Sequence, residues 1–308
     1  MMRVAALDCG TNSLRLLVAD LDGRGATDVV RRMEIVRLGE GVDRTGRLSP
    51  DALARTFAVL DEYSEIIRDL GVDATRMVAT SATRDATNRD QFVAGVAARL
   101  GVEPEVVSGE EEAALSFAGA TRELRARSDL ASPYLVVDIG GGSTEFVLGD
   151  QAGPNAARSV DIGCVRMTER HLVDDPPTGQ QVDAARVDIA AAIEDASASV
   201  PVEQAKTMIG LAGSVTTVVA LVLGLDRYDH ARIHHAQVSA ADVHRVTTSL
   251  LHATRAERAA LPVMHPGRVD VIGGGALVLD TILSQVGFSS VVASEHDILD
   301  GIAFSLEA

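Results

Sequence analysis

Tryptophan is absent, and aromatic residues make up only 3% of the 308 residues. Hydrophobic residues still reach 46%, so aliphatic side chains must form the core, and intrinsic disorder is excluded. No apolar run reaches the ~18–20 residues that a membrane-spanning helix needs, and the N-terminus carries no signal-peptide pattern. The only cysteines, Cys9 and Cys164, are too few for a disulfide framework or a cysteine metal site, so we expect two buried thiols in a cytoplasmic protein.

Positive charge is scarce: 28 Lys and Arg residues stand against 44 Asp and Glu residues, for a formal net charge of −16. This balance argues against broad electrostatic binding of nucleic acid. It also disfavours long-range attraction of any polyanion. A polyanionic substrate would have to be attracted locally, by a metal ion, a few arginines and backbone N–H groups.

Segments typical of strands alternate with segments typical of helices, which predicts an α/β fold. The clearest helix begins at Ser49-Pro50-Asp51, where a capping hydroxyl precedes a proline, and it ends at Gly71. The chain length favours two domains. We place the first at residues 1–126, with a closing helix at 297–308 packing back onto it, and the second at 127–296.

One supersecondary unit occurs twice in the sequence. Each copy is an apolar strand that ends in Asp-x-Gly, then a turn with a serine, then a return strand. Aligned 130 positions apart, the copies share Asp8 with Asp138, Gly10 with Gly140, Ser13 with Ser143 and Asp20 with Asp150. The repeat predicts a duplicated domain.

The turn of the first copy is a candidate phosphate loop. Gly10 would let backbone N–H groups approach an anion, and the side chains of Thr11, Asn12 and Ser13 add donors. Arg15 could fork onto phosphate oxygens. An ordinary hairpin turn followed by an exposed arginine is the alternative.

The turn of the second copy contains three consecutive glycines, Gly140, Gly141 and Gly142, followed by Ser143. Such a run costs folding entropy, and close backbone contact with a bulky anion would explain it. Asp138 and Glu145 flank this turn and could share a hard cation such as Mg²⁺. A hairpin in which Asp138 caps its own turn is the alternative.

A third candidate segment opens a helix at residues 108–113. Ser108 and Glu111 fit a capping box, which accounts for Glu111 structurally. Glu112 lies beside the apolar residues Leu115 and Phe117, where a carboxylate could serve as a general base for water.

Other charged or glycine-containing segments are weaker candidates. Arg84, which follows a strand, could clamp a phosphate chain or be a solvated loop residue, and Arg166 could supply another clamp. Gly213 and Ser214 open an apolar helix whose N-terminus could face an anion. The histidines show no metal-binding spacing, and we expect the cluster of His230, His234 and His235 to lie on the surface.

Taken in order along the chain, these segments resemble the exopolyphosphatase and guanosine pentaphosphate phosphohydrolase family. That family belongs to the superfamily of actin, sugar kinases and heat-shock ATPases, and this chain is similar to its short, two-domain form. The resemblance implies an α/β fold of two duplicated ribonuclease-H-like, actin-like ATPase domains flanking a central cleft. It implies Mg²⁺-dependent release of orthophosphate from inorganic polyphosphate, with conversion of guanosine pentaphosphate to tetraphosphate as a second reaction.

The resemblance also implies residue roles. Glu112 matches the glutamate that activates water, while Asp138 and Glu145 match the ligands of Mg²⁺, which Mn²⁺ could replace. The positions that would hold phosphates are Thr11, Asn12, Ser13, Arg15, Arg84, Gly140, Gly141, Gly142, Ser143, Gly213 and Ser214. The implied partners are polyphosphate or a phosphorylated guanosine nucleotide and, by analogy, a second copy of the chain, with neither nucleic acid nor membrane.

The sequence departs from that family at two places, and two other functions remain open. Glu110 stands where a neutral residue is common, and residues 297–301 lack an arginine that the family usually shows. A kinase or nucleoside triphosphatase on the same fold remains an alternative, with Gly273-Gly274-Gly275, after a strand expected at 269–272, serving an adenosine. A non-catalytic sensor of such nucleotides is the other.

Overall fold

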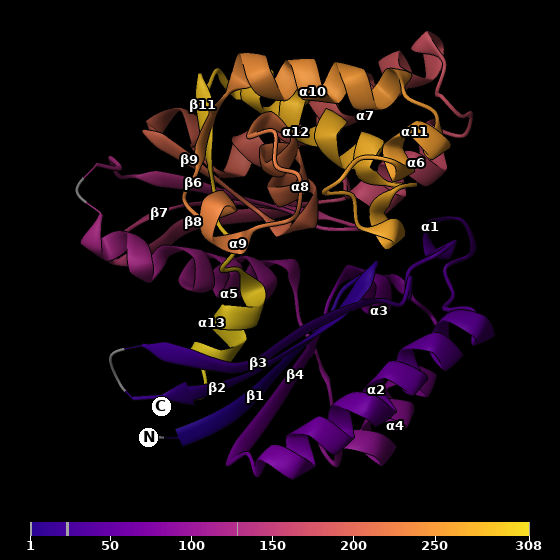
Figure 1. The fold of residues 1–308 in the computed structure, drawn as a ribbon, viewed down its shortest axis with the longest axis vertical. Coiled ribbons are helices and arrows are strands. Elements are labelled where there is room, and N and C mark those ends of the chain that lie inside the picture. Colours follow the sequence, from indigo (N-terminus) through magenta and orange to yellow (C-terminus); the bar gives the residue numbers. More distant parts are fainter. Residues whose placement is uncertain (1, 23–24, 128, 308) are drawn as a thin grey trace. The chain divides into compact units, whose positions relative to one another are not determined.

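The computed structural model describes residues 2–22, 25–127 and 129–307 (Figure 1). The chain forms two compact units, one made of Met1–Gly119 and Ile298–Ala308 and the other of Ala120–Asp297. The division after Gly119 comes earlier than the boundary we placed at 126. No helix within the described ranges is long and apolar enough to cross a membrane.

The first unit is built around a five-stranded sheet in the order β3-β2-β1-β4-β5. Strand β1 is antiparallel to β2 and parallel to β4. The strands are β1 (Met2–Cys9), β2 (Ser13–Leu21), β3 (Ala26–Ile35), β4 (Ala74–Ala79) and β5 (Glu105–Val106). The helices are α1 (Val42–Thr45), α2 (Pro50–Leu70), α3 (Ser81–Asp85), α4 (Arg89–Leu100), α5 (Gly109–Thr121) and α13 (Ile298–Phe304).

Alternation along β1 divides the core of this unit between the two faces of the sheet. Ala5 and Leu7 pack with residues of α2 and α4, whereas Val4 and Ala6 pack with α5 and α13. The predicted start of α2 is confirmed, because Ser49 Oγ accepts a hydrogen bond from the Ala52 N–H at 3.1 Å. The closing helix α13 therefore belongs to the same layer as α5, against the sheet of the first unit (Figure 1).

The second unit repeats this topology with one extra strand. Its six-stranded sheet has the order β10-β11-β9-β6-β7-β8, so β8-β7-β6-β9-β11 corresponds to β3-β2-β1-β4-β5. The strands are β6 (Tyr134–Ile139), β7 (Thr144–Asp150), β8 (Gly153–Val160), β9 (Thr207–Leu211), β10 (Gln237–Ser239) and β11 (Ser290–Ala293). The helices are η1 (Glu123–Ala126), α6 (Cys164–His171), α7 (Gly179–Ser199), η2 (Val202–Gln204), α8 (Ala212–Val222), α9 (His230–Ile233), α10 (Ala240–His252), α11 (Arg255–Ala259), η3 (Pro266–Arg268) and α12 (Ile272–Val286).

The predicted duplication is confirmed down to the turns. The Gly10 N–H donates to the Ser13 carbonyl at 3.0 Å, and the Gly140 N–H donates to the Ser143 carbonyl at 3.0 Å. Cys9 and Cys164 are both buried free thiols, as predicted.

The strand expected at 269–272 is wrong. Residues 266–268 form a 3-10 turn, and the glycines 273–275 lie buried inside the first turns of α12. A short apolar run such as Val269–Ile272 fits the start of a buried helix as well as a strand, so its pattern alone does not distinguish the two.

Candidate active site

Glu112 lies in the first turn of α5 and is buried, with 8% of its surface exposed. The Glu111 N–H donates to Ser108 Oγ at 3.2 Å, which is one half of the predicted capping box. The carboxylate of Glu111, however, accepts a hydrogen bond from Arg76 Nη2 at 3.0 Å. The two neighbouring glutamates thus differ: Glu111 points to the surface and Glu112 into the protein.

Arg84 holds the carboxylate of Glu112 in place. Its Nη1 donates to Glu112 Oε2 at 3.1 Å and to the Val107 carbonyl at 3.0 Å. Arg84 lies in α3, at the end of β4, whereas Glu112 belongs to α5. The predicted phosphate clamp is therefore in contact with the predicted general base, and its charge neutralises and orients that carboxylate.

Helix α13 supports α5 beneath Glu112. A Cβ atom on Gly301 would lie 2.0 Å from the Leu115 carbonyl oxygen, so only glycine permits this contact. The preceding residue, Asp300, is buried and accepts a hydrogen bond from Arg31 Nη2 at 2.5 Å. The segment 297–301 lacks the arginine that the family usually shows, but the guanidinium of Arg31 on β3 contacts this segment at Asp300.

Several groups in and beside the first glycine turn are bonded within their own unit. Thr11 Oγ1 lies 2.9 Å from Ser81 Oγ, and the Asn12 carbonyl accepts a hydrogen bond from the Arg37 N–H at 2.9 Å. Arg15 donates to Asp8 Oδ2 through both Nε, at 2.9 Å, and Nη2, at 2.7 Å. The charge of Arg15 is thus opposed by a buried carboxylate, which weakens the expectation that it forks onto a phosphate.

The second glycine turn presents its N–H groups in one direction. The Gly140 carbonyl accepts from the Cys164 N–H at 2.9 Å, and the Gly141 and Gly142 carbonyls also accept from N–H groups at the start of α6. In a planar trans peptide, the C=O and the following N–H point in opposite directions. The N–H groups of Gly141, Gly142 and Ser143 therefore point away from α6, as in an anion-binding nest.

Two carboxylates face each other beside this turn. Asp138 on β6 lies directly opposite Glu145 on β7, and their exposed fractions are 7% and 1%. Residues in such cross-strand pairs have Cβ atoms about 4.5–5.5 Å apart on one face of the sheet. Glu145 Oε1 also accepts a hydrogen bond from Ser159 Oγ at 2.7 Å.

The duplicated unit shows what is unusual about this pair. The equivalent cross-strand pair of the first unit is Asp8 opposite Arg15, an ion pair. In the second unit, a glutamate replaces that arginine, so two buried carboxylates adjoin. Two adjoining carboxylates can share a cation, and carboxylate oxygens are the ligands that Mg²⁺ prefers. The donor set therefore fits the predicted magnesium site.

Comparison with known proteins shows the family of the chain. A model described as the Ppx/GppA phosphatase family matches residues 17–308. The chain belongs to the Ppx/GppA phosphatase family. It is 50% identical to exopolyphosphatase 2 of Mycobacterium tuberculosis, over 99% of this chain and 98% of that protein.

Solved structures give the same result. An exopolyphosphatase-like protein is 45% identical with a TM-score of 0.95, over 99% of this chain and 98% of the other. The PPX-GPPA enzyme of Aquifex aeolicus is 29% identical with a TM-score of 0.82, over 99% of each chain. The predicted fold, two duplicated α/β domains of the actin-like type, is confirmed by these likenesses and by the matching strand orders.

Arg268 is a further candidate for phosphate binding in this Ppx/GppA chain, and the sequence did not indicate it. Its Nη1 lies 3.3 Å from the Gly213 carbonyl and 3.3 Å from Thr217 Oγ1, so its guanidinium covers the first turn of α8. Ser214 is buried within that turn, and Ala212 adopts a left-handed φ of 67°. No local motif marks Arg268, because a distant 3-10 turn brings it to α8.

Gly163 packs directly against the second glycine turn and leaves no space for a side chain. A Cβ atom there would lie 2.3 Å from the Gly141 carbonyl carbon and 2.4 Å from the Gly142 nitrogen. We expect Gly163→Ala to displace the turn, to lower the free energy of unfolding by about 1–3 kcal/mol and to raise KM for the phosphorylated substrate at least ~10-fold. Thermal unfolding and steady-state phosphate release would measure both. Gly179→Ala is the control, since its Cβ would meet nothing within 4 Å; equal effects of the two substitutions would contradict the prediction.

Proposed function

We propose that this chain hydrolyses terminal phosphoanhydride bonds of inorganic polyphosphate and releases orthophosphate. The observation that carries the proposal is the buried Asp138–Glu145 pair beside three N–H groups that point in one direction. Such a site combines ligands for a hard cation with donors for phosphate oxygens. The 50% identity to an exopolyphosphatase supports polyphosphate as the substrate.

Local groups would attract the substrate despite the net charge of −16. The N–H groups of Gly141, Gly142 and Ser143 would donate to oxygens of the chain end. Arg84 uses only Nη1 for its bonds to Glu112 and Val107, so we assign the other edge of its guanidinium to a phosphate oxygen. Donors that are fixed close to the substrate bind an anion without long-range attraction.

Glu112 would act on water. Its carboxylate is oriented by Arg84 and fixed by the turn of α5, so it accepts the proton of a water molecule that attacks the terminal phosphorus. Phosphoryl transfer needs little covalent help from the protein, and positioning with electrostatic stabilisation supplies most of the rate. Asp138 and Glu145 would hold Mg²⁺, with Mn²⁺ as a substitute. When bound, the ion neutralises charge on the phosphate oxygens.

Two finer assignments belong to the same proposal. Conversion of guanosine pentaphosphate to tetraphosphate is a second reaction of the same site, because both substrates end in a phosphoanhydride, and the Ppx/GppA family match favours it. A homodimer is proposed by analogy with the family.

Phosphate release from a substrate panel tests the proposal. Long polyphosphate, tripolyphosphate, guanosine pentaphosphate and ATP would each be incubated with the protein and Mg²⁺. We expect kcat/KM for long polyphosphate to exceed that for ATP by at least ~10²-fold. Preferred cleavage of ATP would favour the nucleoside triphosphatase or kinase alternative, and tight binding without turnover of any substrate would favour a sensor.

A further inference from the structure

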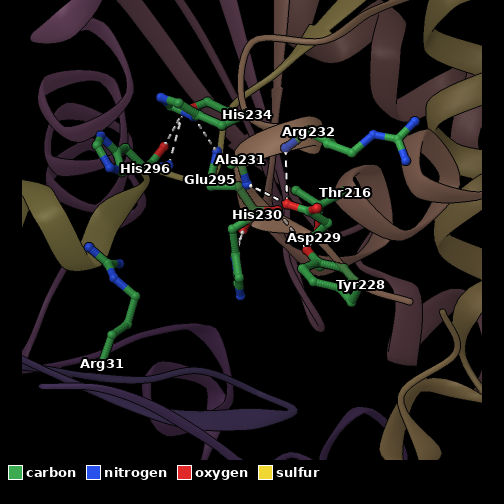
Figure 2. A network of polar contacts seen from close by, with 12 residues as sticks. Arg31, Thr216, Tyr228, Asp229, His230, Ala231, Arg232, His234, Glu295 and His296 are labelled. Carbon is green, nitrogen blue, oxygen red and sulfur yellow. Dashed lines mark hydrogen bonds and ion pairs between the residues drawn. The ribbon is translucent and has the colours of Figure 1, made fainter. Parts of the chain in front are cut away.

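A cluster of imidazoles and carboxylates in the second unit has no part in the proposed phosphate chemistry. Its members come from η1, from the loop after α9 and from the segment after β11; Figure 2 labels His234, Glu295 and His296. They are Glu123, His234, His235, Glu295 and His296. The sequence predicts surface positions for His234 and His235, and this is wrong, because both are half-buried.

Ligand atoms of three members converge. One atom each from Glu123, His234 and His235 lie within 4.8 Å of one another. The rings of His234 and His235 stack with their centroids 3.7 Å apart. His296 Nδ1 lies 3.6 Å from Glu123 Oε2. This spacing suits ligands around one ion rather than separate hydrogen-bonded pairs.

His235 carries two signs of a functional constraint. Its backbone adopts a left-handed φ of 63°, and backbone hydrogen bonds hold it, with His235 N–H donating to the Ala293 carbonyl at 2.7 Å. Its Nε2 atom is buried, and nothing in the described part of the chain gives it a hydrogen-bond partner. A strained backbone and a buried, unsatisfied nitrogen both cost stability, and a ligand for that nitrogen explains both.

The protonation states suit a metal. Burial lowers the pKa of His234 and lowers that of His235 to about 4, so both rings are neutral near pH 7. Burial raises the pKa of the Glu123 carboxyl, but the hydrogen bond from His234 and the neighbouring imidazoles together lower it further, so the pKa is lowered overall. Neutral imidazole and ionised carboxylate are the forms that bind metal.

We propose that Glu123, His234 and His235 bind a borderline transition-metal ion, Zn²⁺, at a site separate from the Asp138–Glu145 pair. Two imidazole nitrogens and one carboxylate oxygen are a common zinc ligand set, with His296 or water as the fourth ligand. Mg²⁺ prefers oxygen ligands only, so it does not compete well here.

Binding changes two hydrogen bonds of the metal-free cluster. The Glu295 N–H donates to His234 Nδ1 at 3.1 Å, so the proton of this ring resides on Nε2, which donates to Glu123 Oε2 at 3.1 Å. To ligate through Nε2, His234 moves its proton to Nδ1, so the bond to Glu123 is replaced by shared ligation of the ion and the bond from Glu295 is lost. One lost hydrogen bond lowers the affinity by about tenfold, so the site is weaker than a closed structural zinc site.

Residues near the first and the last residue of the second unit meet in this cluster. Glu123 follows shortly after Ala120, where this unit begins, and His296 directly precedes Asp297, where it ends. With His296 as the fourth ligand, a bound ion joins the two segments by which the chain enters and leaves the unit. Because the ion binds only the folded cluster, Zn²⁺ is expected to raise the melting temperature.

Calorimetric titration with Zn²⁺ in excess Mg²⁺ tests the proposal. We expect one Zn²⁺ per chain, with affinity at least tenfold lower in Glu123→Gln and His235→Asn. Glu123→Gln is the safer variant for folding, since 53% of that side chain is exposed. The matched control is His252→Gln, an exposed histidine on α10 whose removal should leave the affinity unchanged. A Glu145→Gln protein titrated in parallel should still bind its one Zn²⁺.

Spectroscopy gives an independent measurement. Co²⁺ at the cluster should show the strong visible absorption of four-coordinate cobalt, and His235→Asn should abolish it. The proposal is overturned if the wild-type protein binds no Zn²⁺, if the cluster variants bind as tightly as the wild type, or if His252→Gln loses the same affinity.

Discussion

Replacing Glu112 with glutamine is expected to lower kcat for phosphate release at least ~10²-fold and to leave KM within about twofold. Glutamine keeps the volume of the side chain and an oxygen that accepts the Arg84 hydrogen bond, now 3.1 Å long. It removes only the capacity to take a proton from water. Because substrate contacts come from other groups, binding should persist while turnover falls. Steady-state phosphate release from long polyphosphate measures both constants.

The neighbouring glutamate supplies the control. Glu111 lies one residue away in α5, but its carboxylate is at the surface with Arg76. Glu111→Gln should retain kcat within about twofold, since no reacting atom contacts it. Full activity of Glu112→Gln would refute the assignment of the base, and equal losses in both variants would point to a fault in the helix instead.

The internal repeat explains why the sequence predicted so much of the fold. Asp-x-Gly and the following serine sit at a hairpin whose geometry depends on local residues, and the two copies form the same Gly-to-Ser hydrogen bond. Cap signals such as Ser49 likewise act within one helical turn. Features determined by neighbours in the chain were therefore open to prediction, whereas the short apolar run at 269–272 was not, because burial decides between helix and strand there.

The parts of the candidate site that depend on contacts between distant segments could not be predicted from the sequence. Ser159 reaches Glu145 only through the register of β7 and β8, and Arg268 reaches α8 from a turn more than fifty residues away. The bond between Arg84 and Glu112 also depends on how β4 and α5 pack. Residue type and spacing selected Glu112, Asp138 and Glu145 as candidates, but their partners follow from tertiary structure.

Removing divalent cations is expected to reduce phosphate release at least ~10³-fold, and Glu145→Gln should have an effect of similar size. The reason is the like-charged pair: Asp138 and Glu145 adjoin in a buried cross-strand position that fits a shared cation. Glutamine preserves the acceptor for Ser159 but halves the negative charge at the site. Phosphate release with excess chelator, and after adding back Mg²⁺ or Mn²⁺, measures the first effect; activity in excess chelator would contradict it.

The stability of the metal-free protein shows whether Glu145→Gln loses activity because a cation ligand is removed or because the fold is damaged. Glu145→Gln removes one negative charge from a buried cross-strand position and keeps the acceptor for Ser159, so the metal-free variant should be at least as stable as the wild type. Mg²⁺ should raise the melting temperature of the wild type but not of the variant. At the equivalent position of the first unit we expect a loss of stability. Arg15→Gln leaves buried Asp8 without its ion pair and should lower the free energy of unfolding by about 3 kcal/mol. Thermal unfolding of the two variants with chelator decides the matter, because a destabilised Glu145→Gln would show that the carboxylate pair is a structural feature rather than a cation site.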